Sequence, residues 1–286
     1  AERSDVARRC PRQRTKLLRK ASARRRLHAR GYTCAGSGPD IRQGESGERG
    51  VSMMGGVYPW LHQVASALDG EDWLLVGGAM TQLHCALSHV GYGRTTEDVD
   101  IVVDPIDNST LVGVAEALER RAGYEQITPL RREGFLHQFR HEEGSQVDVM
   151  GIDSDRTPDR WRGYNVVKCP GSKSALGRLS SGTPKDVLEV PVSEAHTVRL
   201  PNAWSALAMK GHALQLPDAN RERHVQDALA LLACAHRTEV KRGLTKSEHS
   251  GVNKILSSSH LSEVENWMPL DQTHWGEALK LSLIHI

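Results

Sequence analysis

The sequence predicts an α+β fold, in which a mixed sheet with flanking helices is followed by a mainly helical C-terminal part. A short apolar run at Trp73–Val76 is followed by Gly-Gly and then by apolar residues at helical spacing over 79–89. A β-branched run at Val99–Val103 predicts the next strand. Beyond residue 201 the apolar spacing is helical, over 201–214 and again over 219–234.

Two aspartates at the start of the second strand carry the clearest chemical signal. Residues i and i+2 of a strand share a face, so Asp98 and Asp100 project side by side. Adjacent like charges repel and are costly to desolvate unless a cation neutralises them, and oxygen ligands select Mg²⁺. The Gly77-Gly78 pair lets a phosphate approach backbone amides at a helix N-terminus. Together these features predict metal-assisted handling of a nucleoside triphosphate.

The segments around this centre supply further elements and a third acid. Periodicity and turn residues predict a helix over 58–68, a helix over 110–121 capped by Asn108-Ser109, and a β-hairpin with arms 134–140 and 146–152. Asp148 lies in the second arm of the hairpin. An isolated acid in a strand usually faces solvent, but the aspartate pair upstream favours a role for Asp148 in the same site.

The second half of the chain is less regular. Residues 153–186 predict an irregular connection with short strands, 187–192 and 197–200 predict strands, Pro201 fits the first turn of the next helix, and 261–267 and 275–283 show weak helical spacing. Lys210 lies on or near the inward face of the helix over 201–214, where it either extends its ammonium group to water or serves a site. Arg223 and Asp227 are four residues apart and suit an ion pair on the surface of the following helix.

The order of these motifs resembles the DNA polymerase β nucleotidyltransferase superfamily. The matching residues are Val76-Gly77-Gly78 and the run Arg94-Thr95-Thr96-Glu97-Asp98-Val99-Asp100. The same order is similar to the AbiEii/AbiGii toxins of type IV toxin–antitoxin systems, and the resemblance covers about Tyr58 to Ala235. The chain departs from the pattern at Ala79, where many members have Ser or Thr, and at His224, where an acid is common.

This resemblance implies a polymerase β-like nucleotidyltransferase fold that binds an NTP and two Mg²⁺ ions. By analogy the metal ligands are Asp98, Asp100 and Asp148, of which Asp148 also activates the acceptor, and Lys210 completes the catalytic set. The implied nucleotide-binding residues are Gly77, Gly78, Arg94, Thr96 and Lys210. The resemblance also implies that the acceptor is the 3′ end of tRNA, with pyrimidine nucleotides as donors, and that a cognate antitoxin is a partner.

Alternatives from other functional classes remain open at this point. One is a catalytically degenerate nucleotide-binding or antitoxin module, which Ala79 favours. Another is a nucleotidyltransferase that modifies a small molecule or a protein. The CCA-adding enzymes are disfavoured, because their Arg-Asp pair and Leu-Leu-Gly are absent after the glycines, over 81–87.

Composition divides the chain of 286 residues into unequal parts. The net charge of +2 conceals a basic start: residues 1–30 hold twelve basic and two acidic residues, so the remainder has 25 basic and 33 acidic residues, a net charge of −8. We expect 1–52 to be a disordered basic arm or upstream translation before Met53, 53–200 a nucleotidyltransferase domain, 201–280 a helical region, and 281–286 a translated sequencing adapter. Five scattered cysteines and the absence of a long apolar span predict a cytoplasmic protein without a membrane helix.

Overall fold

The computed structural model describes residues 59–104, 108–131, 133–174, 187–217, 220–235 and 244–263, together with residues 267, 269, 270 and 272. The expectations for the basic arm 1–52, for the periodicity over 275–283 and for 281–286 concern residues outside these ranges.

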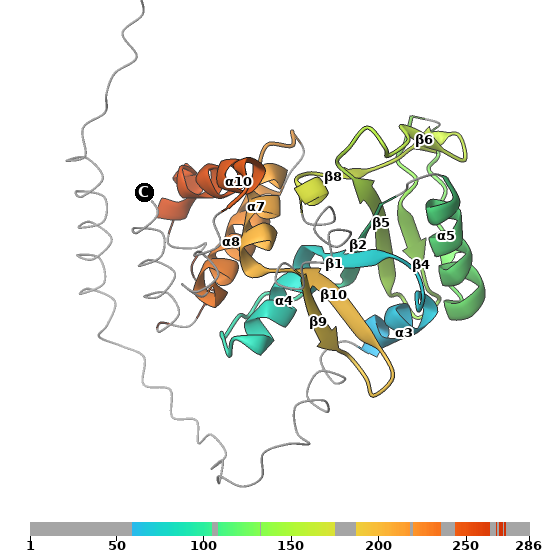
Figure 1. Ribbon diagram of the computed structural model, residues 1–286, viewed down its shortest axis with the longest axis horizontal. Coiled ribbons are helices and arrows are strands. Elements are labelled where there is room, and N and C mark those ends of the chain that lie inside the picture. Colours follow the sequence, from blue (N-terminus) through green and yellow to red (C-terminus); the bar gives the residue numbers. More distant parts are fainter. Residues whose placement is uncertain are drawn as a thin grey trace, which may run out of the picture.

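The described chain has a mixed α/β architecture built on one principal sheet (Figure 1). Its strands lie in the order β1 (Trp73–Val76), β2 (Asp98–Val103), β5 (Gln146–Ile152), β4 (Gln138–Arg140) and β3 (Glu125–Gln126), with β8 (Lys168–Cys169) beside β5. The β2–β5 and β5–β8 pairs are parallel, and the other pairs are antiparallel. The mixed sheet and flanking helices predicted from the sequence are thereby confirmed.

Helices cover the sheet because its strands are apolar on the faces that they bury. Every residue of β1 is buried, and Val99 and Ile101 of β2 are fully buried, whereas Asp98 and Asp100, which alternate with them, are only partly buried. The covering helices are α3 (Pro59–Ala67), which packs against α5 (Asn108–Ala122), and α4 (Gly77–Leu87), which follows β1 directly and contacts β1 and β2. The face of β2 that carries the two aspartates is thus left to form a site.

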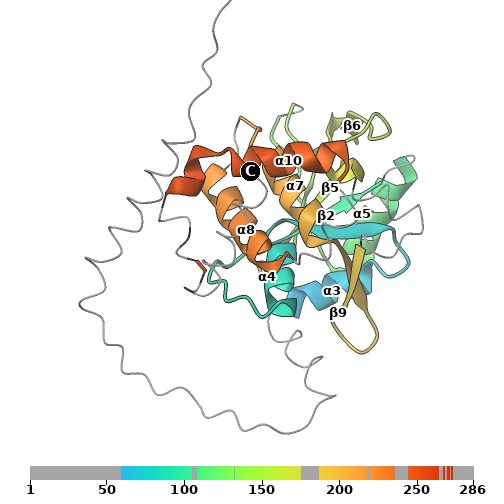
Figure 2. The same ribbon diagram turned by 60° about the vertical axis from the view of Figure 1, so that its left-hand side comes forward.

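The C-terminal helices pack on the α4 side of the sheet. They are α7 (Ala203–Ala213), α8 (Arg221–Cys234) and α10 (Lys246–Leu256), and Figure 2 shows α8 beside α4 and α10 across α7. Cys85 of α4 and Cys234 of α8 are buried with their sulfur atoms 3.8 Å apart. A Cβ atom on Gly211 would lie 1.8 Å from the carbonyl oxygen of Gly251, so the crossing of α7 and α10 depends on these glycines.

Short strands connect the sheet to the helical part. The antiparallel pair β9 (Val187–Pro191) and β10 (Thr197–Pro201) lies against β1 and leads into α7, while β6 (Arg160–Trp161) and β7 (Tyr164–Asn165) form a small hairpin. Among the described residues, no helix is both long and apolar enough to cross a membrane.

Several element boundaries differ from the sequence predictions. Helix α4 begins at Gly77 rather than Ala79, and the first hairpin arm is a strand only over Gln138–Arg140. Pro201 is not in a helical turn: it ends β10 opposite Val187, and the Asn202 side chain caps α7 by accepting from the Ser205 amide at 2.9 Å.

Helix α10 was not predicted as a helix, because its three large apolar residues, Val252, Ile255 and Leu256, all lie in its C-terminal half. The buried residues of this helix are Glu248, Gly251, Val252, Ile255 and Leu256. It begins with a capping box, in which the Thr245 side chain accepts from the Glu248 amide and the Glu248 carboxylate accepts from the Thr245 amide. A 3₁₀ turn, η2 (Ser259–Ser262), follows it and overlaps only the start of the range 261–267 that shows weak periodicity.

Candidate metal and nucleotide site

Three aspartates meet on two neighbouring parallel strands. Asp98 and Asp100 lie on one face of β2, and the β2–β5 register places Asp148 directly beside Asp100. One carboxylate oxygen from each of the three residues lies within 4.8 Å of the others. They are the one group of three or more such ligands among the described residues. The fold therefore brings the two neighbouring aspartates of β2 together with a third acid from β5.

Asp100 carries a charge that the protein alone does not balance. Burial and then the neighbouring carboxylates of Asp98 and Asp148 raise the pKa of Asp100 to about 7, although Lys210 and Arg223 oppose the shift. Burial also raises the pKa of Asp148, although His137 and a hydrogen bond from Gln146 oppose the shift. A proton or a cation is needed to hold these carboxylates together.

Asp98 has different partners from Asp100. Its Oδ1 accepts a hydrogen bond from the Thr96 hydroxyl at 2.5 Å and one from Nη2 of Arg223 at 3.2 Å. Burial favours the neutral acid, but these two contacts outweigh burial and hold the pKa of Asp98 below its usual range. Asp98 is therefore ionised at neutral pH and is already paired with a cation.

The glycine pair lets site side chains approach the start of α4. Gly77 has a φ of +69°, and a Cβ atom there would lie 1.7 Å from Oδ2 of Asp100. A Cβ atom on Gly78 would lie 2.7 Å from both Nη2 of Arg94 and Oγ1 of Thr96. Any larger residue at either position would displace the side chains that form the site. The predicted contact of these glycines with a triphosphate stays a prediction.

A buried ionic network lies next to the carboxylates. Asp227 of α8 is almost fully buried and accepts from Lys210 Nζ at 2.6 Å, from Arg94 Nε at 2.8 Å and from the Tyr92 hydroxyl at 2.8 Å. Arg94 Nη2 also lies 2.7 Å from Oδ1 of Asp227. Burial opposes ionisation of Asp227, but the two cations hold its pKa below the usual range. The network joins α7, α8 and the loop before β2.

This network corrects two interpretations from the sequence. The Lys210 side chain is 8% exposed, so its ammonium group does not extend into water but binds Asp227. Arg223 and Asp227 do not pair along the helix surface, because α8 directs Arg223 toward Asp98 and Asp227 toward Lys210. The role of Lys210 in contacting phosphates stays a prediction.

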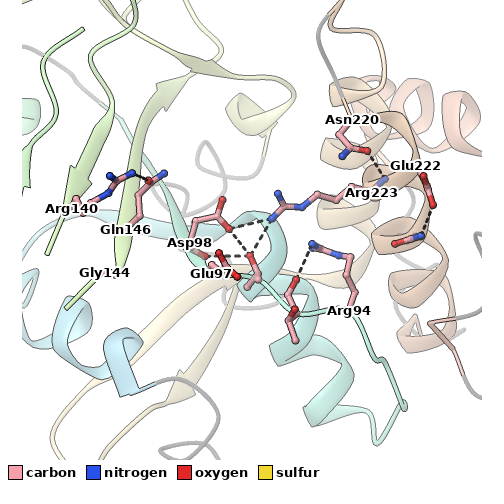
Figure 3. Close-up of a pocket in the computed structure, with 12 residues that line it drawn as sticks. Arg94, Glu97, Asp98, Arg140, Gly144, Gln146, Asn220, Glu222 and Arg223 are labelled. Atoms are coloured by element: carbon pink, nitrogen blue, oxygen red, sulfur yellow. Dashed lines mark hydrogen bonds and ion pairs between the residues drawn. The ribbon is translucent and has the colours of Figure 1, made fainter. Parts of the chain in front are cut away.

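A cavity of about 670 Å³ opens beside Asp98, between the β4–β5 hairpin and the N-terminal end of α8 (Figure 3). Its walls carry three arginines and three acids among hydroxyl and amide groups. The lining residues are Arg94, Thr95, Thr96, Glu97, Asp98, Arg140, Gly144, Gln146, Asn220, Glu222, Arg223 and Gln226. The lining is almost entirely polar, which suits a charged ligand better than an apolar one.

Four residues at the site were not assigned to it from the sequence. Tyr92 and Asp227 hold Arg94, Gln146 donates to Asp148 at 2.8 Å, and Arg223 contacts Asp98. Gln146 could have been found from the strand period, since it lies two residues before Asp148. Asp227 gives little signal in the sequence, because its partners come from other elements that only the fold brings close.

The carboxylate group fits a divalent cation of the Mg²⁺ type. All of its donors are oxygens, and the 4.8 Å limit on their separations is close to the roughly 4 Å that spans two opposite ligands of one Mg²⁺. The raised pKa of Asp100 shows that the site gains from an added positive charge. Asp98, Asp100 and Asp148 are the residues that would hold the ion.

The similarities of this chain to known proteins are structural and distant. The sequence matches no model of a known protein family and no curated protein sequence. An antigenic nucleotidyltransferase-like protein from Paracoccidioides brasiliensis is similar over 76% of this chain and 93% of its own, with 15% identity and a TM-score of 0.43. JHP933 from Helicobacter pylori is similar over 82% of this chain and 90% of its own, with 14% identity and a TM-score of 0.38.

Proposed function

We propose that this chain is a Mg²⁺-dependent nucleotidyltransferase that moves a nucleoside monophosphate from an NTP to an acceptor hydroxyl. The observation that carries the proposal is the convergence of Asp98, Asp100 and Asp148 on adjacent parallel strands, where burial and the two other acids raise the pKa of Asp100 more than Lys210 and Arg223 lower it. A polar cavity with three arginines adjoins the carboxylates and has space for a charged nucleotide.

The reaction assigns a role to each part of the site. The acceptor oxygen attacks the α-phosphorus, the bond from that phosphorus to the bridging oxygen breaks, and pyrophosphate leaves. Asp148 accepts the proton of the acceptor hydroxyl, because its partly buried carboxylate has a raised pKa. Bound Mg²⁺ would supply the positive charge that aligns the phosphates and stabilises the charge that develops on them.

The acceptor that we propose is the 3′ end of tRNA, with pyrimidine nucleotides as donors and a role as the toxin of a toxin–antitoxin or abortive-infection system. The similarity of Arg94–Asp100 to the AbiEii/AbiGii pattern supports this assignment. A basic surface on the C-terminal helices would add support, but Lys210 is buried and contributes nothing to it. Arg221 is exposed, and Arg237, Lys241 and Arg242 lie outside the described residues.

The test incubates the protein with Mg²⁺, total tRNA and each α-labelled NTP in turn, with Asp100→Asn as the inactive control. We expect label from CTP or UTP in the tRNA band with the wild type alone. Label in the protein or in a small molecule would refute the tRNA acceptor and keep the transfer reaction. Absence of transfer to any acceptor would refute the enzymatic assignment.

A catalytically degenerate nucleotide-binding or antitoxin module is the second candidate. It is favoured by Ala79, a fully buried residue that offers no hydroxyl where the resembling proteins have Ser or Thr. This candidate predicts that NTP binding raises the melting temperature while no acceptor becomes labelled. Measuring both properties on one preparation distinguishes the two functions.

A further inference from the structure

The cations around the carboxylates differ in how firmly they are held. Lys210 is buried, the Arg94 side chain is 14% exposed, and both bind Asp227, which is itself buried and held by a third donor, Tyr92. The Arg223 side chain is 38% exposed and reaches Asp98 from α8 across the edge of the cavity, as Figure 3 shows. Lys210 and Arg94 are therefore fixed parts of the protein, whereas Arg223 has room to move.

The contact between Arg223 and Asp98 is weak by its geometry. One guanidinium nitrogen, Nη2, serves both Oδ1 of Asp98 and Oγ1 of Thr96, each at 3.2 Å. The same Oδ1 atom already accepts the shorter bond from Thr96. A partly exposed ion pair with one long bond contributes little to stability, so a competing cation displaces it at small cost.

A metal ion at the carboxylates would compete directly with Arg223. Asp98 belongs both to the three-carboxylate group and to the Arg223 pair. Two positive charges that share one carboxylate repel each other, so metal binding drives the guanidinium away from Asp98. A planar guanidinium with several donors is well suited to a phosphate, and the side chain already lies in the wall of the cavity.

We propose that Arg223 exchanges partners: it pairs with Asp98 in the metal-free protein and with the phosphates of the nucleotide when the metal–nucleotide complex is bound. The inference rests on the proposed function and assigns to Arg223 a mobile contact that Lys210 and Arg94 do not provide. It also predicts that metal alone and nucleotide alone bind less well than the two together, because each leaves one charge without its partner.

The test measures Mn²⁺ binding by electron paramagnetic resonance and then binding of α,β-methylene-CTP and α,β-methylene-ATP with Mn²⁺ present. The variants are Arg223→Gln and Arg223→Lys. The matched control is Arg221→Gln, which removes an exposed charge from the same helix, and no RNA is present in any of the measurements. We expect Arg223→Gln to bind Mn²⁺ alone about two- to fivefold more tightly, since the competing cation is gone. We expect it to bind the nucleotide analogues at least roughly tenfold more weakly. Arg223→Lys should resemble the wild type more closely in both.

Two results would overturn the inference. One is Mn²⁺ affinity of Arg223→Gln that is equal to or below that of Arg221→Gln. The other is an unchanged affinity of Arg223→Gln for both analogues. Failure of the proposed function has a different signature, in which the wild-type protein itself binds neither Mn²⁺ nor an analogue. Circular dichroism of each variant checks that the fold is retained.

Discussion

The two charged groups at the centre of the molecule are balanced in opposite ways. In the ionic network, Asp227 is buried with two cations and a tyrosine hydroxyl, so its charge is fully compensated within the protein. In the carboxylate group, Asp100 is surrounded by two further acids, and its pKa rises to about 7. The difference indicates that the ionic network around Asp227 stabilises the fold, whereas the carboxylate group around Asp100 needs a ligand.

The comparison predicts that removing Asp227 has the largest effect on stability. Asp227→Ala leaves the buried Lys210 and the largely buried Arg94 without the carboxylate that both bind, and the expected loss is about 3–5 kcal/mol in the free energy of unfolding. Urea denaturation measures the loss. Glu222→Gln, which removes an exposed carboxylate from the same helix, should change stability by less than about 0.5 kcal/mol. Equal effects of the two substitutions would contradict the assignment of Asp227 as the compensated charge.

Removing Asp100 should have the opposite sign and should depend on pH. The folded protein binds the Asp100 proton more tightly than the unfolded chain does, so the stability that this carboxyl contributes is present at low pH and lost as the pH rises from about 4 to 7. Asp100→Asn therefore stabilises the metal-free protein at pH 8 relative to pH 4, by at most about 4 kcal/mol. Denaturation at several pH values tests this. A stability difference that is constant with pH would show that Asp100 is not charge-strained.

A methyl group at Gly77 should damage the site more than the fold. Its Cβ atom would overlap Oδ2 of Asp100, and a left-handed backbone at a non-glycine residue costs roughly 1–2 kcal/mol. We expect Gly77→Ala to lose Mg²⁺-induced stabilisation while it unfolds only slightly earlier than the wild type. Gly144→Ala, at another left-handed glycine with no atom near its Cβ position, controls for the backbone term. Retained Mg²⁺ stabilisation in Gly77→Ala would refute the contact with Asp100.

An ion pair on the surface should have the smallest effect on stability. Arg120 and Glu116 lie 3.5 Å apart on the exposed side of α5, far more exposed than the pair of Lys210 and Asp227. Arg120→Ala should change the free energy of unfolding by roughly 0.5 kcal/mol or less, because solvent screens the pair. A loss as large as that of Asp227→Ala would mean that burial does not distinguish these ion pairs.

Much of the fold follows from patterns that act over short distances. The apolar run of β1, the glycine pair and the alternation in β2 are local, and they predict a strand, a helix and a strand with the two aspartates on one face. The parallel β2–β5 pairing that adds Asp148 is not local: the upstream aspartates and the resemblance predict that Asp148 shares the site, but neither predicts this pairing. The interior position of Asp227 was not predicted, because its partners Lys210 and Arg94 come from other elements. Helix α10 was not predicted either, because a glycine contact and a capping box, rather than a long apolar stripe, define its first half.

Thermal unfolding with and without Mg²⁺, for the wild type and Asp100→Asn at pH 6 and pH 8, tests most directly that the three aspartates form a metal site. A ligand at 100 times its Kd stabilises the state that binds it by about 2.7 kcal/mol. We predict that Mg²⁺ raises the melting temperature of the wild type, more at pH 8 than at pH 6 because Asp100 must lose its proton, and leaves Asp100→Asn nearly unchanged. Equal Mg²⁺ stabilisation of both proteins, or none in the wild type, would contradict the account.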